Sequence, residues 1–467
     1  MVTRLSPTDA SFYRLENTAT PMYVGSLSIL RRTRGGLSYE TLLQTVEQRL
    51  AQIPRYRQKV REVSGMARPV WIDDRDFDIT YHVRRSALPS PGSDAQLHEL
   101  IGRLAARSLD KSRPLWEMYL VEGLANNRVA IYTKSHQALV TGMGAPEIGH
   151  VIVDRTRRAP AFPEDIWIPE REPGSTRLLF SALGDWIMGP GAQLQAVGSA
   201  LAGLATNQAG LRVAGRRAID FARTVVRGTA PSSPLNAAVS RNRRFTVARA
   251  SLEDYRKVRA RYDCDINDLV LAVVTGALGN WLLSRGEAVA PTATIRAMAP
   301  LSVYADGLDS TGPGQPIRQV TPFLVDLPVG EGNAVVRLSQ IAHATESSPS
   351  AASRVDARTI VALSGFAPPT LHAMGIRVAT SFPARQFNLL ITNAPGAQSQ
   401  MYVAGAKLLE TYVVPPLLAN QALAISVTSY NGMLYFGINA DRDAMSDVEV
   451  LPGLLDQSLE ELLGASR

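Results

Sequence analysis

The sequence predicts a mixed α/β protein made of two domains. The chain has 467 residues, a length that suggests two to three domains at roughly 150 residues each. Strand-like and helix-like patterns alternate in both halves, and a proline-rich stretch at residues 157–174 separates them. We therefore expect an N-terminal domain over residues 1–165, a linker and helical crossover over 166–235, and a C-terminal domain over 236–467.

The first half opens with a clear strand and a clear helix. Tyr23–Leu30 alternates with period two, as a half-buried strand does, and Tyr39–Leu50 has apolar residues at helical spacing. Asn126-Asn127 favours a hairpin turn between two later strands. The other elements expected here are extended pieces at Trp71–Asp74 and Tyr81–Val83, helices at Leu97–Arg107 and Met143–Val153, and strands at Glu117–Glu122 and Val129–Lys134.

The segment after the prolines is rich in alanine, glycine and leucine, with arginines spaced along it. From Thr176 to Arg227 this composition indicates one or two amphipathic helices. Helices that cross over and pack between the two domains are one interpretation. Contact of these helices with a membrane surface is the other.

The second half has the same α/β character without a detectable sequence repeat. Its longest helix is expected at Asn267–Leu283, with Asn267-Asp268 at the start, and the Asn431-Gly432 pair predicts a hairpin turn. The expected strands are Phe245–Ala250, Thr294–Pro300, Gln319–Leu327, Phe387–Thr392, Ala424–Tyr430 and Leu434–Asn439, and the other helices are Glu253–Arg261, Ala334–Thr345 and Val448–Leu463.

Composition excludes several classes of protein. Hydrophobic residues make up 45% of the chain and charged residues 19%, which is a globular composition and excludes a disordered chain, a collagen and a coiled coil. The single cysteine, Cys264, excludes an internal disulfide framework and a multi-cysteine metal site. The six histidines are too scattered to indicate a zinc cluster.

The net charge of +7 suits a polyanionic ligand, such as an anionic membrane or coenzyme A. No block of five or more basic residues is present, so nucleic-acid binding is not expected. Residues 1–25 lack the pattern of a signal peptide, and no uncharged apolar run reaches 18 residues. We therefore expect a cytoplasmic protein, with peripheral contact at the inner membrane face as an option.

The most informative stretch runs from Val129 to Gly142, where a strand leads into a histidine and then a glycine turn. A histidine at a strand end can act as a general base, because the strand fixes its position and the loop leaves it accessible. Such a histidine can also be purely structural. The residues by themselves leave both roles of His136 open.

Short motifs along nearly the whole chain occur in an order typical of one family. They are Leu5–Tyr13, Thr20–Gly25, Pro69–Trp71, Pro114-Leu115-Trp116-Glu117, Ser233–Asn236, Asn267-Asp268, Asn393–Gly396, Pro415-Pro416 and Ser429–Gly432. Each motif is short, but together they are specific. The chain resembles the bacterial wax ester synthase/acyl-CoA:diacylglycerol acyltransferase family, and its composition resembles that of actinobacterial proteins.

The resemblance implies a fold and two substrates. Members of this family resemble coenzyme-A-dependent acyltransferases of the chloramphenicol acetyltransferase type, in which two mixed α/β domains meet at a tunnel that holds the active site. The implied reaction transfers an acyl chain from acyl-CoA to a lipid alcohol, giving triacylglycerol from diacylglycerol, or a wax ester. The resemblance implies no bound cofactor and no metal, and it allows contact with a membrane or lipid-droplet surface.

The family's catalytic motif, HHxxxDG, is altered in this chain. When the motif is aligned on the strand and on Gly142, the first histidine is His136, the second histidine is Gln137, and the aspartate is Thr141. The second histidine is the family's general base. The resemblance therefore assigns His136 and Gln137 to the catalytic position, Thr141, Gly142, Asn267 and Asp268 to motif support, and Pro114, Leu115, Trp116 and Asn393 to substrate binding.

Several of these assignments have a structural alternative. Trp116 can be a core residue behind the motif strand, and Asn267-Asp268 can be a helix-start pair. Asn393 can be a turn residue. The sequence excludes neither the structural nor the functional role of these residues.

Replacing the base changes the chemistry. Imidazole accepts a proton at neutral pH, whereas a carboxamide forms hydrogen bonds but cannot carry the proton. Loss of a general base costs about 10²–10⁴-fold in rate, or roughly 3–5 kcal/mol. Neighbouring side chains on a strand point to opposite faces, so His136 could replace the base only after a local twist. Two functions stay open: a weak acyl-CoA-dependent O-acyltransferase, and a non-catalytic acyl-CoA- or lipid-binding paralogue or partner of a lipid-synthesis enzyme.

Overall fold

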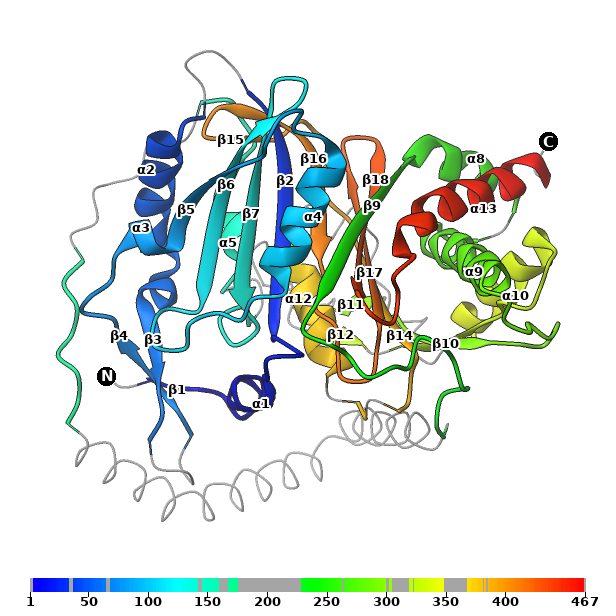
Figure 1. The fold of residues 1–467 in the computed structure, drawn as a ribbon, viewed down its shortest axis with the longest axis horizontal. Helices are drawn as coiled ribbons and strands as arrows, with labels where there is room; N and C mark the ends of the chain where they lie inside the picture. Colours follow the sequence, from blue (N-terminus) through cyan, green and yellow to red (C-terminus); the bar gives the residue numbers. More distant parts are fainter. Residues whose placement is uncertain are drawn as a thin grey trace, which may run out of the picture.

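The computed structural model describes residues 3–32, 37–63, 68–141, 145–158, 167–174, 228–262, 264–299, 302–304, 319–321, 323–347, 368–380, 382–383 and 385–465. The helices expected over 176–227 and the motif glycine, Gly142, lie outside these ranges. Within them the chain forms two α/β halves side by side, each built on one large sheet with helices against it (Figure 1). The mixed α/β architecture predicted from the sequence is confirmed.

The first sheet carries the histidine motif and has the strand order β5-β6-β7-β2-β16-β15-β8. The β5–β6 pair is parallel and the other neighbours are antiparallel. The β6–β7 turn has Asn126 and Asn127 at φ of 60° and 54°, the left-handed conformation that a tight hairpin needs. The strands are β2 (Tyr23–Arg31), β5 (Val83–Ala87), β6 (Trp116–Leu124), β7 (Arg128–His136), β8 (Val153–Asp154), β15 (Tyr402–Val403) and β16 (Ala406–Val414).

The helices of the first half begin where a side chain caps the first turn. Ser38 accepts a hydrogen bond from Thr41 N at the start of α2, and Ser93 forms a capping box with Gln96 at the start of α4. The elements are α1 (Pro7–Leu15), α2 (Tyr39–Arg49), η1 (Leu50–Gln52), η2 (Pro54–Arg57), α3 (Ile79–His82), α4 (Asp94–Ala105) and α5 (Ile148–Val151), with a small sheet of β1 (Thr3–Arg4), β4 (Val70–Asp73) and β3 (Gln58–Arg61).

The second sheet has the strand order β13-β10-β14-β17-β18-β9. Four helices lie on one side of it, with the long apolar α9 packed between α10 and α13 (Figure 1). The strands are β9 (Arg243–Ser251), β10 (Ile295–Met298), β13 (Leu324–Leu327), β14 (Leu389–Ala394), β17 (Leu423–Tyr430) and β18 (Met433–Asp441), and the helices are α8 (Leu252–Arg261), α9 (Ile266–Ser284), α10 (Ala334–Glu346) and α13 (Leu451–Ala465), preceded by η4 (Val448–Val450). A separate pair joins β11 (Ser302–Tyr304) to β12 (Gln319–Thr321).

Elements from the second half tie the two halves together. Helix α12 (Pro368–Ala379) lies between the two sheets and contacts β14 on one side and β2 and α5 on the other (Figure 1). Strand β16 pairs along β2, with Val414 opposite Gly25. Strand β18 approaches β16 closely at Gly437, where an added Cβ would lie 2.0 Å from the Val413 oxygen. The motif sheet therefore needs residues from both ends of the chain.

The sequence predictions differ from the structure in a few places. Residues Tyr81–Val83 were expected to be extended, but α3 ends at His82 and the strand begins at Val83, because Asp78 caps a short helical turn. The helix expected at Met143–Val153 is limited to Ile148–Val151 in the described residues, where Glu147 caps it. Strand β16 and helices α1 and α12 are among the elements that were not expected. The domain boundaries stay a prediction, although β15 and β16 place residues 402–414 in the first sheet.

Candidate active site at the histidine motif

The histidine motif is held by its backbone from both neighbouring strands. His136 is the last residue of β7, and its N donates to Leu115 O at 3.0 Å. Gln137 N donates to Met22 O at 2.9 Å, on the β2 side. The side chains of His136 and Gln137 are both fully buried. The motif therefore lies inside the protein, at the end of a central strand.

The His136 imidazole organises the turn that follows it. Its Nδ1 accepts a hydrogen bond from Ala138 N at 3.0 Å, and its ring lies edge-on to Tyr13 of α1. Its Nε2 is 3.7 Å from Glu16 Oε2, beyond hydrogen-bond distance. Burial lowers the pKa of His136 to about 4, so the ring is neutral at pH 7. This geometry favours the structural role that the sequence left open.

The Gln137 side chain is different, because it is buried without partners. Neither its Oε1 nor its Nε2 has a hydrogen-bond partner among the residues that the structure describes. Leaving a buried polar group unsatisfied costs about 1–3 kcal/mol. An amide with both ends open is suited to a ligand that offers a donor and an acceptor. The open amide is compatible with the assignment of Gln137 to the catalytic position, which stays a prediction.

An arginine from the second half clamps the motif. Arg377 on α12 donates to Gln137 O at 2.7 Å and to Asp9 Oδ1 at 2.6 Å. The Arg377 guanidinium also lies over the ring of Phe12, 4.8 Å from its centroid. The clamp joins α12, α1 and the motif. Sequence reasoning missed both charged residues, although Asp9 lies within one of the family motifs.

The remaining motif-support residues are separate from this clamp. Thr141, which replaces the family's aspartate, is exposed, and Gly142 lies outside the described residues. Asn267 and Asn393 are 126 residues apart and meet, with Asn393 Nδ2 donating to Asn267 Oδ1 at 3.3 Å. Asp268 accepts from Asp265 N at the start of α9, which confirms the helix-start interpretation.

Several of these positions differ from what the sequence suggested. Asn393 lies within β14 and not in a turn. Among the described residues, neither Asn267 nor Asn393 hydrogen-bonds to Gln137. The asparagine pair is therefore a second polar centre at the start of α9, and its role in the site stays a prediction.

The Pro114-Leu115-Trp116 segment leads into β6, the strand that pairs with the motif strand β7 in the same sheet. All three residues are buried. The Trp116 indole donates to Tyr56 O at 2.8 Å and stacks on His82 with the ring centroids 4.6 Å apart. The structure therefore favours the core interpretation of Trp116, and substrate contact by this segment stays a prediction.

Two family models match this chain. The wax ester synthase/diacylglycerol acyltransferase catalytic domain matches residues 5–270, and the WS/DGAT C-terminal domain matches residues 319–463. The chain belongs to the wax ester synthase/diacylglycerol acyltransferase family. The altered HHxxxDG segment at His136 and Gln137 lies within the residues that match the catalytic-domain model.

Individual relatives agree with the family assignment. A probable diacylglycerol O-acyltransferase, tgs3, of Mycobacterium tuberculosis is 80% identical over 266 residues, which are 57% of this chain and 98% of tgs3. The wax ester synthase/diacylglycerol acyltransferase from Marinobacter aquaeolei VT8 is 25% identical, with a TM-score of 0.68 over 99% of both chains. The starter condensation domain of rhizomide synthetase, solved with C8-CoA, shares the fold at 13% identity and a TM-score of 0.56, over 100% of this chain and 94% of that domain.

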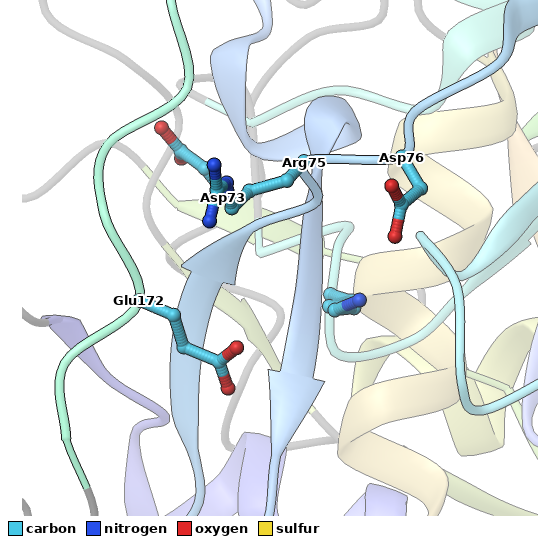
Figure 2. A pocket seen from close by; sticks show the side chains of 5 residues that line it. Asp73, Arg75, Asp76 and Glu172 are labelled. Carbon is cyan, nitrogen blue, oxygen red and sulfur yellow. The ribbon is translucent and has the colours of Figure 1, made fainter.

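The described residues contain no group of three or more His, Cys, Asp or Glu side chains that could hold a metal ion. A polar surface depression beside the β3–β4 hairpin includes no motif residue; Figure 2 shows Asp73, Arg75 and Asp76 around it, with Glu172 from the extended segment 167–174. One described helix, α9, has the length and hydropathy of a membrane span, and 78% of its apolar window is buried in the fold, as in a core helix.

Proposed function

We propose that this WS/DGAT protein transfers a long acyl chain from acyl-CoA to a lipid alcohol, with diacylglycerol as the first acceptor to test. Family membership over nearly the whole chain supports the reaction class. The observation that carries the proposal is the buried and unpartnered carboxamide of Gln137, which lies where the family's motif places its base.

Gln137 can orient the substrates but cannot take the proton. Its Nε2 can donate a hydrogen bond to the thioester carbonyl, and its Oε1 can accept one from an N–H or O–H of the bound acyl-CoA. Such positioning supplies rate through proximity and hydrogen bonding. His136 does not replace the base, because its ring lies against α1 and has Nδ1 occupied by Ala138 N. We therefore expect a slow enzyme.

The direct test follows release of free coenzyme A thiol from a long-chain acyl-CoA, with diacylglycerol and a long-chain alcohol as acceptors. The parent protein should turn over slowly, and Gln137→His should raise the rate tenfold or more, up to about 10⁴-fold, because an imidazole there accepts the proton. Gln137→Asn is the matched control, since it keeps an amide and restores no base. No thiol release by either the parent or Gln137→His, with any acceptor, would refute the proposal.

We also propose that the protein works in the cytoplasm at the surface of a membrane or lipid droplet. The acceptor lipid is insoluble, and the net charge of +7 favours an anionic surface. Co-flotation with vesicles of anionic and neutral phospholipids tests this idea. Binding that is equal on both vesicle types, or absent from both, would argue against electrostatic docking.

A further inference from the structure

A fully buried carboxyl, Glu147, lies beside the motif strand and has no part in the chemistry described above. Its Oε2 accepts a hydrogen bond from Gly149 N at 2.7 Å, and its backbone N donates to Thr370 Oγ1 on α12 at 3.1 Å. Its Oε1 accepts a hydrogen bond from Ser135 Oγ on β7 at 3.0 Å. Glu147 is therefore fixed between the motif strand and the helix that carries the Arg377 clamp.

Ser135 places this carboxyl on the face of β7 that Gln137 shares. Side chains alternate along a strand, and Lys134 and His136 lie against α4 and α1 on the other face. Strand β7 ends at His136, but the backbone N of Gln137 still donates to Met22 O, the next position of the β2–β7 register, and from this we infer that the alternation extends to position 137. Residues 135 and 137 therefore share the face opposite His136.

No lysine or arginine forms an ion pair with Glu147 in the part of the chain that the structure describes. Burial raises the pKa of Glu147 to about 7, and the hydrogen bonds from Ser135 Oγ and Gly149 N offset part of that rise. Burial also lowers the pKa of the neighbouring His150 to about 4, so that ring is neutral at pH 7. The groups around the carboxyl are Thr133 and Ser135 from β7, Gly149 and His150 from α5, Thr370 from α12, and Tyr56 from η2, whose hydroxyl contacts Ser135 Oγ.

We propose that Glu147 is the proton acceptor that replaces the missing motif base, acting through the Ser135 hydroxyl. The inference rests on the proposed acyl transfer. As the acceptor oxygen bonds to the thioester carbon, its proton passes to Ser135 Oγ, and the original Ser135 proton passes to Glu147 Oε1. When the carbon–sulfur bond breaks, the coenzyme A thiolate leaves and takes a proton from Ser135 Oγ, and Glu147 Oε1 returns its proton to Ser135; a thiol pKa of about 8.5 favours this return. Glu147 itself does not touch the substrate.

The test measures the rate of thiol release against pH for Glu147→Gln and Ser135→Ala. Either change should lower the rate by about 10²-fold, the lower end of the range for general base catalysis. In the parent the rate should rise with pH through about 7, because the unprotonated carboxylate is the active form, and both variants should lose this rise. Glu122→Gln is the matched control, since Glu122 on β6 pairs with Arg85 near the surface. It should keep the parent's rate and pH profile.

The Gln137→His background separates this role from a structural one. A histidine there supplies the base, so Glu147→Gln should have little effect on that protein. Three outcomes would overturn the proposal. The first is an equal loss of rate from Glu147→Gln in both backgrounds, and the second is a folded Glu147→Gln single variant that keeps the parent's rate and pH profile. The third is an inactive parent beside an active Gln137→His protein. If Glu147→Gln does not fold, Ser135→Ala decides by the same criteria. Inactivity of both the parent and Gln137→His overturns the proposed function itself, and this inference with it.

Discussion

Replacing Arg377 by methionine should destabilise the protein and loosen the motif together. The Arg377 and Asp9 side chains are 15% and 4% exposed, and their charged atoms are 2.6 Å apart. Removing the arginine leaves a buried carboxylate without its cation and takes a donor from Gln137 O. Breaking a buried pair in this way costs about 3–5 kcal/mol. Because α12, α1 and the motif share the clamp, we also expect the Gln137→His protein to lose activity when Arg377 is changed.

A double-mutant cycle measured by urea unfolding checks this reasoning. Asp9→Asn combined with Arg377→Met removes both charges, so the double variant should be more stable than the sum of the single losses predicts, by about 2 kcal/mol. Arg256→Met is the matched control, because the Arg256–Glu253 pair is exposed and should contribute less than about 0.5 kcal/mol. Additive losses at Asp9 and Arg377 would show that the two side chains are not coupled and would refute the clamp.

Two further predictions concern packing. Gly437→Ala should lower the free energy of unfolding by about 1–3 kcal/mol, because its Cβ would meet the Val413 oxygen. Gly453→Ala in α13 meets no neighbouring atom and should raise it by about 0.5–1 kcal/mol. Urea unfolding of both variants measures the two changes. Trp116→Phe should lower stability by about 1–3 kcal/mol, because Tyr56 O loses its hydrogen-bond donor, and should leave the KM for acyl-CoA unchanged. A higher KM at unchanged stability would instead favour substrate contact by Trp116.

Elements with strong local signals could be predicted from the sequence. The Asn126-Asn127 and Asn431-Gly432 turns are examples, because their left-handed conformations require these residue types. Helix α12 lacked such a signal: it begins with two prolines, contains Gly375, and is buried nearly all round, so it has no amphipathic pattern. Strand β16 could not be assigned to the motif sheet, because its partner β2 lies almost 400 residues earlier and nothing local encodes that pairing.

The candidate site was predictable only in part. The motif and the loss of its base at Gln137 could be found in the sequence, and strand alternation predicts that His136 and Gln137 point to opposite faces. The Arg377 clamp could not be found, because it depends on the meeting of three distant segments. Glu147 was hidden for a similar reason: an acid before a short helix is usually solvated, and only the fold shows that this one is buried.

The crossing of β16 into the first sheet restricts how this fold can be recombined. A chimera that joins two family members at the proline-rich linker would inherit β2 from one parent and β16 from the other. The two parents would then have to match along the whole ladder from Leu30–Leu408 to Gly25–Val414, including the register shift between Leu408 and Glu410. A fragment that ends at the linker would instead leave one edge of β2 open, a template on which foreign strands can add. The proline-rich linker is therefore a boundary in composition, but the first sheet contains strands from both sides of it.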